Sequence, residues 1–315
     1  MIDRLGRNVT YLRVSVTDRC NFRCTYCTLP ASPRGLLTVE ELERIVRVAG
    51  SLGIVKIRLT GGEPTVRREI VEITGRTARV PGIREVVMTS NGSRLRALAR
   101  PLREAGLKGI NVSLDSLDPE RFRTLTHGGD LAAVLDGIEA AREAGIERIK
   151  VNAVVVGGMN DDEVLAFADF AGTTGIEARF IEYMPTRRGE ARGWTVPYTV
   201  LLDRLQERFT LTPLPAYADG GPAERYRIEE TGAVVGFIHA MSNPFCERCN
   251  RLRVTPDGRI RSCLLTGGEV DFMAAMRSGA GDEEIADLFR KAGDLKPAVY
   301  ELHRLDELDM RTVGG

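Results

Sequence analysis

Residues 11–27 read YLRVSVTDRCNFRCTYC, an apolar, β-branched run that leads directly into three cysteines. Runs of this kind are typical of buried strands. They return in the first two thirds of the chain at residues 54–59, 85–89, 109–114, 148–156 and 177–183. Working outward from the first run, the sequence therefore predicts six strands, each followed by a loop.

Helical patterns lie between these runs. The clearest is TVEELERIVRVAGSLG (38–53), in which Thr38 and Glu41 form a capping box and Gly50 or Gly53 supplies the end. Further helices are predicted at about residues 66–78, 93–105, 130–144 and 161–174. A strand–helix unit that is repeated six times indicates parallel strands joined by right-handed crossovers.

The predicted fold class is therefore α/β. Six units are fewer than the eight that close a TIM barrel, so we expect an open, partial (β/α)6 TIM-like barrel over residues 1–210. A doubly wound open sheet is the alternative. Residues 211–315 differ in texture, with the linker-like TPLPAYADGGPAE (212–224), a second cysteine group and a hairpin at Asp257-Gly258. We expect them to form a smaller C-terminal domain.

Small, polar and metal-binding residues follow the predicted strands. The first strand leads to the cysteines and the second to TGGEP (60–64), and the later ones lead to TSNG (89–92), SLDS (113–116), GGMN (157–160) and EYMP (182–185). The carboxyl ends of barrel strands share one rim, where active sites form. Turn formation explains any one of these loops, but not three cysteines and a glutamate beside them. We therefore predict a site at this rim.

Composition narrows the function classes. Of 315 residues, 44 are Lys or Arg and 44 are Asp or Glu, so the formal net charge is zero. This balance argues against a general affinity for nucleic acid or anionic membranes. There is no run of 18 apolar residues and no apolar signal core at the N-terminus. We therefore expect a cytoplasmic protein with no nucleic-acid and no membrane partner.

The six cysteines form two groups of three, namely Cys20, Cys24 and Cys27, spaced C-x3-C-x2-C, and Cys246, Cys249 and Cys263, spaced C-x2-C-x13-C. In a reducing cytosol such groups bind metal or do redox chemistry more often than they form disulfides. Each group is one thiolate short of a closed zinc site or a fully ligated iron–sulfur cluster. An incomplete ligand set leaves an open, catalytic metal position. Structural zinc is the alternative, and it is stronger for the second group.

The first cysteine group, with Tyr26 before its last cysteine, and GGEP (61–64) resemble the radical S-adenosylmethionine (SAM) superfamily. A closer resemblance covers nearly the whole chain. YLRVSVTDRCNFRCTYC, RLTGGEP, NVSLDSLDP, ARFIEYMP, NPFCERCNRLRVTPDGRIRSCL and the terminal VGG are together similar to the GTP 3′,8-cyclase family of molybdenum cofactor biosynthesis.

This resemblance implies two [4Fe–4S] clusters and SAM as cofactors of a lyase. The first cluster would be held by Cys20, Cys24 and Cys27 and would reduce SAM to methionine and a 5′-deoxyadenosyl radical. That radical would take hydrogen from C3′ of GTP, and attack on guanine C8 would give (8S)-3′,8-cyclo-7,8-dihydroguanosine 5′-triphosphate. The second cluster, on Cys246, Cys249 and Cys263, would hold the guanine base.

A triphosphate must be bound by side chains, because the sequence has neither a Walker loop nor GxGxxG. A buried cation on a barrel strand is costly without an anion, which favours Arg13 and Lys150, both inside apolar strands. The resemblance assigns GTP contacts to the residues Arg13, Arg58, Thr89, Lys150, Arg251, Leu252 and Arg253. It assigns SAM contacts to Tyr26, Gly62, Ser113 and Met184.

The resemblance also implies catalytic roles for Arg251, Arg253, Gly314 and Gly315, since a Gly-Gly tail without side chains can enter a narrow active site. The expected partners are GTP, a flavodoxin- or ferredoxin-like electron donor and the downstream cyclic pyranopterin monophosphate synthase. A homodimer is a further expectation.

Two other functions stay open. A radical SAM enzyme with an auxiliary cluster could act on a peptide or another small molecule, and the Asn250–Arg253 motif argues against it. A zinc-dependent nucleic-acid binding module would place both cysteine groups on zinc. The neutral charge and the lack of aromatic–basic interleaving argue against this second function.

Overall fold

The structure is a computed structural model that describes residues 1–27, 35–185, 192–216, 221–265 and 269–299. In these ranges twelve strands form one sheet, in the order β12-β11-β10-β1-β2-β3-β4-β5-β6-β9-β8-β7. The six predicted strands are confirmed as its centre, and they are β1 (Tyr11–Ser15), β2 (Lys56–Thr60), β3 (Glu85–Ser90), β4 (Leu107–Ser113), β5 (Arg148–Val155) and β6 (Glu177–Glu182). They are parallel and lie side by side in chain order.

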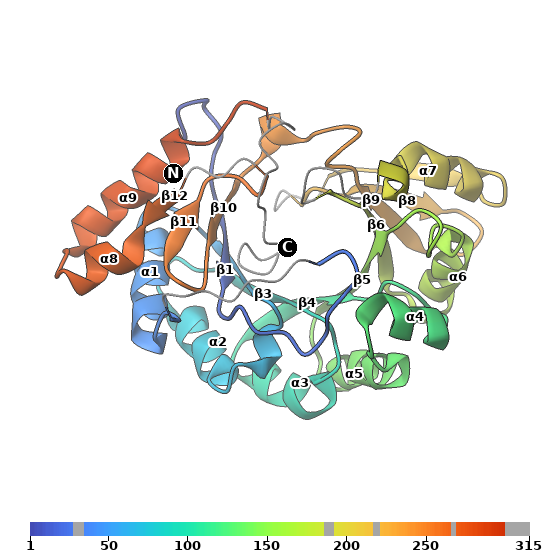
Figure 1. The fold of residues 1–315 in the computed structure, drawn as a ribbon, viewed down its shortest axis with the longest axis horizontal. Helices are drawn as coiled ribbons and strands as arrows, with labels where there is room; N and C mark the ends of the chain where they lie inside the picture. Colours follow the sequence, from blue (N-terminus) through green and yellow to red (C-terminus); the bar gives the residue numbers. More distant parts are fainter. Residues whose placement is uncertain (28–34, 186–191, 217–220, 266–268, 300–315) are drawn as a thin grey trace.

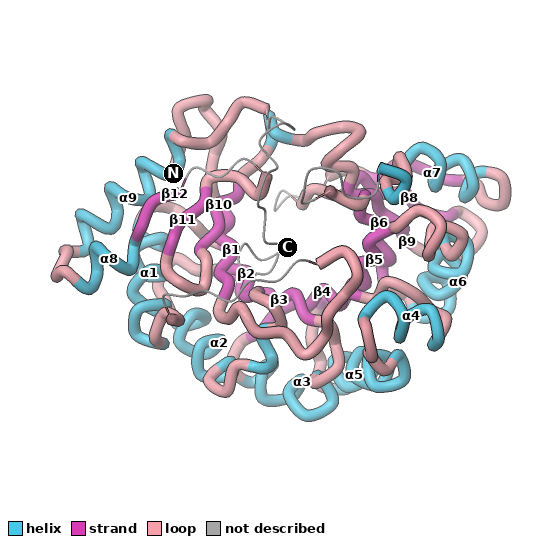
Figure 2. The backbone as a smooth tube through the Cα atoms, viewed as in Figure 1, coloured by secondary structure: helices cyan, strands magenta, loops and turns pink. Residues whose placement is uncertain are grey.

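Helices cover the outer face of this sheet (Figure 1). They are α1 (Val39–Ser51), α2 (Ile70–Arg79), α3 (Leu95–Glu104), α4 (Pro119–Thr126), α5 (Leu131–Glu143) and α6 (Val164–Thr174). Figure 2 shows the strands curving around the interior with the helices outside them. The doubly wound alternative is therefore wrong, because that fold carries helices on both faces of its sheet.

Local sequence signals explain where helices begin. The predicted capping box precedes α1, where Glu41 N donates to Thr38 Oγ1 at 3.2 Å and Thr38 N donates to Glu41 Oε2 at 2.8 Å. The sequence analysis missed α4. Its signal was Asp118-Pro119, because Asp118 Oδ1 accepts from Arg121 N at 2.7 Å and proline suits the first helical position.

The C-terminal region extends the same sheet at both edges. β10 (Arg251–Val254) pairs parallel with β1, and β11 (Arg259–Arg261) and β12 (Glu269–Asp271) continue antiparallel from it. At the other edge β9 (Val234–Ile238) pairs parallel with β6 and leads to β8 (Glu224–Ile228) and β7 (Leu211–Leu214). The predicted open sheet is confirmed, but its parallel part has eight strands instead of six. The domain boundary at residue 210 stays a prediction.

The segment between β9 and β10 crosses the open side of the sheet. β9 lies beside β6 and β10 lies beside β1, so residues 239–250 connect the two ends of the parallel part (Figure 1). Cys246 and Cys249 lie in this crossing. Three further helices complete the described chain, namely α7 (Tyr198–Gln206), α8 (Phe272–Arg277) and α9 (Asp282–Asp294).

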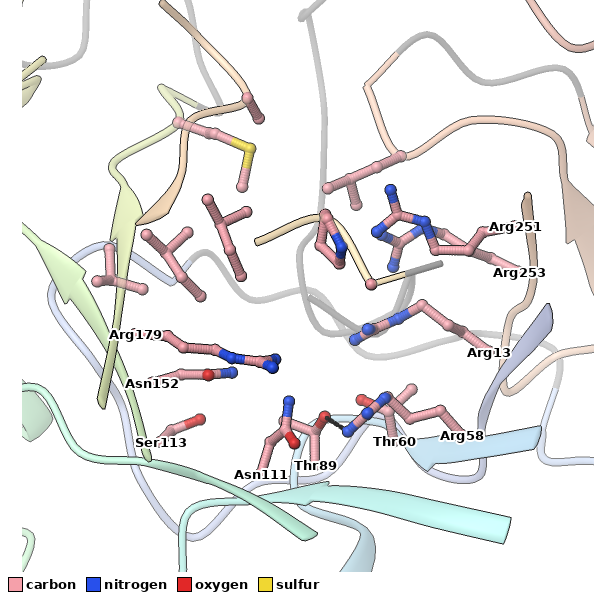
Figure 3. A pocket seen from close by; sticks show the side chains of 18 of the residues that line it. Arg13, Arg58, Thr60, Thr89, Asn111, Ser113, Asn152, Arg179, Arg251 and Arg253 are labelled. Atoms are coloured by element: carbon pink, nitrogen blue, oxygen red, sulfur yellow. Dashed lines mark hydrogen bonds between the residues drawn. The ribbon is translucent and has the colours of Figure 1, made fainter. Parts of the chain in front are cut away.

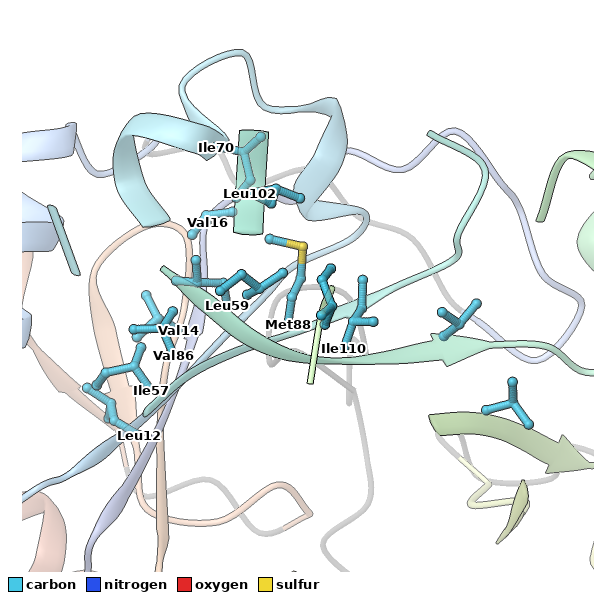
Figure 4. Packing of buried hydrophobic residues seen from close by; sticks show 14 of the residues in the cluster. Leu12, Val14, Val16, Ile57, Leu59, Ile70, Val86, Met88, Leu102 and Ile110 are labelled. Carbon is cyan, nitrogen blue, oxygen red and sulfur yellow. The ribbon is translucent and has the colours of Figure 1, made fainter. Parts of the chain in front are cut away.

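The core lies between the sheet and its helices. Alternate strand residues such as Leu12, Ile57 and Met88 are fully buried and pack toward Ile70 and Leu102 of the outer helices (Figure 4). Side chains on a strand alternate between faces, so the residues between these apolar positions point to the interior. Within the described residues, no helix has the length and apolar character that a membrane span requires.

Candidate active site

The inner face of the sheet lines a cavity of about 360 Å³. Strands β1 to β6 and β10 contribute side chains to it, and both cysteine groups reach it. The structure brings nearly all the predicted site residues to this cavity, which is lined by Arg13, Cys20, Cys24, Tyr26, Cys27, Arg58, Gly62, Thr89, Ser113, Lys150, Met184, Cys246, Cys249, Arg251, Arg253 and Cys263.

Leu252 is placed differently from its neighbours. It is fully buried in the hydrophobic core, on the face of β10 opposite to Arg251 and Arg253. Strand alternation turns the Leu252 side chain away from the cavity, so the predicted GTP contact at this position would have to come from its backbone. Gly314 and Gly315 lie outside the described residues.

Arginines from three adjacent strands gather on one wall of the cavity. The pairing of β1 with β2 and with β10 puts Arg13 between Arg58 and Arg253. Figure 3 shows Arg13, Arg251 and Arg253 pointing into the cavity, with Arg179 facing them from β6. Burial lowers the pKa of Arg13 to about 10, and burial followed by repulsion from Arg13 and Arg251 lowers that of Arg253 well below its ordinary value. Such a cluster of buried and half-buried cations favours a multiply charged anion.

Tyr11 lies within this arginine cluster and was missed in the sequence analysis. Its hydroxyl accepts from Arg58 Nε, and Lys56 Nζ lies 5.2 Å from its ring centroid. Burial by itself would raise the pKa of Tyr11, but Arg58, Arg13 and Lys56 together lower it to about 8. The signal was strand alternation, because Tyr11 is two residues before Arg13 and shares its face.

Thr89 and Ser113 stand at the ends of β3 and β4. Thr89 Oγ1 accepts from Arg58 Nη1 at 3.0 Å, and Met88 O accepts from the same nitrogen at 3.0 Å (Figure 3). These two bonds hold the Arg58 guanidinium toward the cavity. Ser113 is in register with Asn152 of β5, and both side chains line the cavity.

Two glutamates, Glu177 and Glu85, form ion pairs with three other cations that line the cavity. Lys150 Nζ lies 3.4 Å from Glu177 Oε2, and Arg179 Nε lies 2.6 Å from Glu177 Oε1. Lys56 Nζ lies 3.3 Å from Glu85 Oε2. Lys56 and Arg179 also line the cavity and were missed by the sequence analysis. The strand registers, which only the fold supplies, place Lys56 beside Tyr11 at the arginine cluster and Arg179 on β6, across the cavity from Arg13 (Figure 3).

The glycines of TGGEP lie against the chain that leads to the first cysteine group. Gly62 N donates to Thr17 O at 2.8 Å, and Glu63 N donates to Arg19 O at 2.8 Å. A Cβ at Gly61 would collide with the Thr17 carbonyl, and a Cβ at Gly62 would collide with that of Arg19. Only glycine therefore allows these two loops to approach so closely.

Glu63 ties two strand-end loops together. Its side chain is buried and accepts from Thr65 N at 3.0 Å, Ser90 Oγ at 2.9 Å and Asn91 N at 2.6 Å. Burial raises the pKa of Glu63, although these hydrogen bonds favour its ionised form. The glutamate that stood out in the sequence thus fixes the rim beside the cysteines.

The first cysteine group lies beside a buried carboxyl. Tyr26 Oη donates to Asp115 Oδ2 at 2.6 Å, and Val154 N donates to Asp115 Oδ1 at 2.9 Å. Burial raises the pKa of Asp115 to about 6 and, with Asp115, raises that of Tyr26. Burial, followed by Asp115 and the neighbouring cysteines, holds the pKa of Cys24 well above its ordinary value.

The second cysteine group lies among cations. Lys296 Nζ lies 3.4 Å from Cys249 Sγ. Burial opposes ionisation of Cys249, but Arg251 and Lys296 outweigh it and lower the pKa of this thiol to about 6. Met184 packs beside Leu265 near Cys246 and Cys263.

Glu182 anchors the crossing segment that carries two of these cysteines. This buried side chain at the end of β6 accepts from Met241 N and Ser242 N, each at 2.9 Å, and from Tyr198 N at 3.0 Å. The segment that leads to Cys246 is thereby fixed to the sheet. Sequence reasoning gave no role to Glu182, whose acceptors become useful only when β9 is placed beside β6.

The two cysteine groups suit clusters better than single ions. Across the described part of the chain, no three His, Cys, Asp or Glu side chains converge on one metal ion. A [4Fe–4S] cluster binds each thiolate at a different iron, so its ligands need a common space and not a common point. Both groups have three cysteines that form no disulfide and line the same cavity, and this arrangement fits a cluster at each.

Family models match almost the whole chain. Residues 14–171 match the model described as Radical SAM superfamily, and residues 176–302 match Molybdenum Cofactor Synthesis C. Solved structures share the fold at low identity. SuiB of Streptococcus suis bound to precursor peptide SuiA aligns with a TM-score of 0.62 at 15% identity, over 82% of this chain and 60% of that longer one. Native anSMEcpe with bound AdoMet aligns at 0.52 and 18%, over 63% of this chain and 60% of its own.

Curated relatives are similar over their full length. GTP 3′,8-cyclase of Moorella thermoacetica is 44% identical over 96% of this chain and 95% of its own. That of Pelotomaculum thermopropionicum is 42% identical over 100% of both chains, and that of Pseudomonas entomophila is 46% identical over 94% and 91%. The chain therefore belongs to the GTP 3′,8-cyclase family of radical SAM enzymes.

Proposed function

We propose that this chain catalyses the radical SAM-dependent cyclisation of GTP to (8S)-3′,8-cyclo-7,8-dihydroguanosine 5′-triphosphate, the first step of molybdenum cofactor biosynthesis. One observation carries the proposal. A single cavity contains two three-cysteine groups and, on β1, β2 and β10, a wall of buried and half-buried arginines. The cysteines suit two clusters, and the arginines suit a triphosphate.

The cofactors are two [4Fe–4S] clusters and SAM. When bound, the cluster at Cys20, Cys24 and Cys27 would supply an electron for SAM cleavage. The cluster at Cys246, Cys249 and Cys263 would supply an open iron for the purine. The chain itself positions these groups. Tyr26 and Asp115 fix the loop of the first group through their 2.6 Å hydrogen bond. Gly62, Ser113 and Met184 line the cavity and are the proposed SAM contacts.

The phosphate chain of GTP is assigned to the arginine cluster. Arg13, Arg58, Arg251 and Arg253 offer several forked donors, which engage phosphate oxygens in pairs. Thr89 holds Arg58 toward the cavity. Lys150 reaches the same cavity while it pairs with Glu177, so a phosphate would compete with a carboxylate for it. Arg251 and Arg253 are also assigned the catalytic roles that the family resemblance implies.

The remaining partners are proposals as well. Gly314 and Gly315 are assigned to the active site, and their deletion is expected to spare SAM cleavage while it lowers formation of the cyclised nucleotide. We further propose a cytoplasmic location, a flavodoxin- or ferredoxin-like electron donor, transfer of product to cyclic pyranopterin monophosphate synthase, and a homodimer. If the chain without Gly314 and Gly315 cyclised GTP at the parent rate, the tail would have no role in the reaction.

Anaerobic reconstitution tests the function directly. Loading with iron and sulfide should give about eight irons per chain. Addition of SAM, a reductant and GTP should then yield 5′-deoxyadenosine together with the cyclised nucleotide, an isomer of GTP that chromatography separates from it by retention time. SAM cleavage without any conversion of GTP would favour the rival radical SAM enzyme with another substrate, and a colourless protein that binds zinc would favour the zinc module.

A further inference from the structure

Lys296 is a buried lysine at the edge of the second cysteine group. It follows α9, and its side chain is 1% exposed. Its ammonium donates to Arg251 O at 2.8 Å, to Ser262 O at 3.3 Å and to Cys249 Sγ at 3.4 Å. An ammonium group has three N–H donors, so these three acceptors use its whole capacity.

Among the three acceptors of Lys296, only Cys249 Sγ can carry a negative charge, since the other two are backbone carbonyls. In the part of the chain that the structure describes, no carboxylate forms an ion pair with this lysine. The next cation, Arg7, is neutralised by Asp3 at 2.7 Å and donates to Cys246 O and Pro297 O, each at 2.9 Å. A buried ammonium without a counter-ion is costly. The thiolates that hold a cluster supply this missing charge.

The three acceptors lie on two segments of the site, around Cys249 and Arg251 and around Ser262. Cys249 is a cluster ligand, Arg251 begins β10, and Ser262 precedes the ligand Cys263. Ser262 Oγ in turn donates to Leu295 O at 3.2 Å, so the end of α9 is itself attached to this loop. One side chain from the outer helical layer therefore joins two ligand segments to the strand that carries the phosphate-binding arginines.

We propose that Lys296 is a positioning residue that fixes the second cysteine group relative to β10 and supplies the positive charge beside the cluster held there. The inference rests on the proposed function, because it takes this group as a cluster site and β10 as a GTP-binding strand. Lys296 contacts Cys249 and two carbonyls and is not among the residues that line the cavity. A neighbouring cation stabilises the reduced, more negative cluster and so raises its reduction potential.

Two substitutions separate position from charge. Lys296→Met removes both the donors and the charge, whereas Lys296→Gln keeps two donors and removes the charge. Lys291→Met is the matched control, because Lys291 lies on α9 and is exposed. Each variant of the full chain is reconstituted anaerobically. The potential of the second cluster is measured in a background in which Cys20, Cys24 and Cys27 are alanine, and GTP binding is measured by calorimetry in the intact chain.

Lys296→Met is expected to shift the second cluster to a more negative potential and to weaken GTP binding about tenfold to a hundredfold. SAM cleavage without GTP should be unchanged. Lys296→Gln should recover much of the GTP affinity but keep the negative shift, and Lys291→Met should match the parent chain. If Lys296→Met fails to fold, the reduction potential of the second cluster in Lys296→Gln tests the proposal by itself.

An unchanged potential and unchanged GTP affinity in both Lys296 variants would overturn the inference. In that case a parent chain that still converts GTP leaves the proposed function intact. If instead the parent chain binds GTP but does not cyclise it, the proposed function fails, and the potential shift still tests the role of Lys296.

Discussion

The two cysteine groups face one cavity but have opposite electrostatic surroundings. Burial in the first place, and then the charge of Asp115, holds the pKa of Cys24 well above its ordinary value. Cys249 is also largely buried, yet Arg251 and Lys296 lower its pKa to about 6. The same ligand type is therefore set beside a buried carboxyl at one site and beside cations at the other.

The parts of the chain that hold the two cysteine groups also differ. The first group follows β1 and is held by loop contacts at the strand ends, through Gly62 and the hydrogen bond between Tyr26 and Asp115. Cys246 and Cys249 of the second group lie in the crossing between β9 and β10, Cys263 follows β11, and Lys296 donates to Cys249 Sγ and Ser262 O. A ligand set does not by itself assign a role. The acidic surroundings suit a cofactor that carries a cationic sulfonium, and the basic ones suit an anionic nucleotide.

The largest effect is expected from removing one ligand at each group. Cys24→Ala should abolish the formation of 5′-deoxyadenosine, because SAM cleavage depends on the first cluster. Cys249→Ala should keep this cleavage detectable and lose the cyclised nucleotide. Both products are measured by chromatography after reconstitution. Loss of cleavage in a folded Cys249→Ala chain that retains its first cluster would break the division of labour between the two groups.

A smaller loss is expected from the arginine cluster. Arg13→Ala and Arg253→Ala should each weaken GTP binding by roughly 1.5–3 kcal/mol, or about 10- to 150-fold, because each removes a charge-assisted contact. SAM binding should persist, and Arg290→Ala, an exposed position on α9, serves as control. Calorimetry that gave equal affinity for GTP and guanosine would contradict the assignment of this wall to phosphate.

Glu63 should matter to the first group and not to the second. Glu63→Ala leaves Ser90 Oγ and the backbone N–H groups of Thr65 and Asn91 without their acceptor, at a cost of about 1–3 kcal/mol for each donor that stays buried. We expect weaker SAM binding and a lower unfolding temperature, with GTP affinity nearly unchanged. Glu63→Gln keeps one acceptor oxygen, so its SAM affinity and unfolding temperature should lie between those of the parent chain and those of Glu63→Ala. Equal losses of SAM and GTP affinity would show that the rim acts as one unit.

The smallest effect is a pH dependence. The pKa of Tyr11 is lowered to about 8, so its phenolate forms as the pH rises through this value and adds a negative charge among the phosphate-binding cations. GTP affinity should therefore fall modestly between pH 7 and about pH 9, and bound triphosphate should raise the pKa of Tyr11. Tyr11→Phe should remove the decline. A parent and a Tyr11→Phe chain with the same pH profile would leave Tyr11 without an electrostatic role.

Local patterns predicted much of the scaffold. The strand from Tyr11 to Ser15 and the capping box at Thr38 and Glu41 depend on neighbours within a few residues, and both are confirmed. Strand alternation could also have predicted that Tyr11 shares the inward face of Arg13, two residues away. It could likewise have predicted that Leu252, between Arg251 and Arg253, points to the opposite face. The helix α4 was missed, although Asp118-Pro119 is a typical helix N-terminus.

The sequence by itself determined the α/β class, the central strands, the two cysteine groups and the family. These follow from periodicity and from motifs that are short along the chain. Only the tertiary structure decided that β9 and β10 extend the sheet at opposite edges, that Arg179 faces Arg13 across the cavity, and that Lys296 meets Cys249 from 47 residues away. The physical reason is that strand pairing and burial depend on contacts between distant segments, and no local pattern of residues specifies which segments will meet.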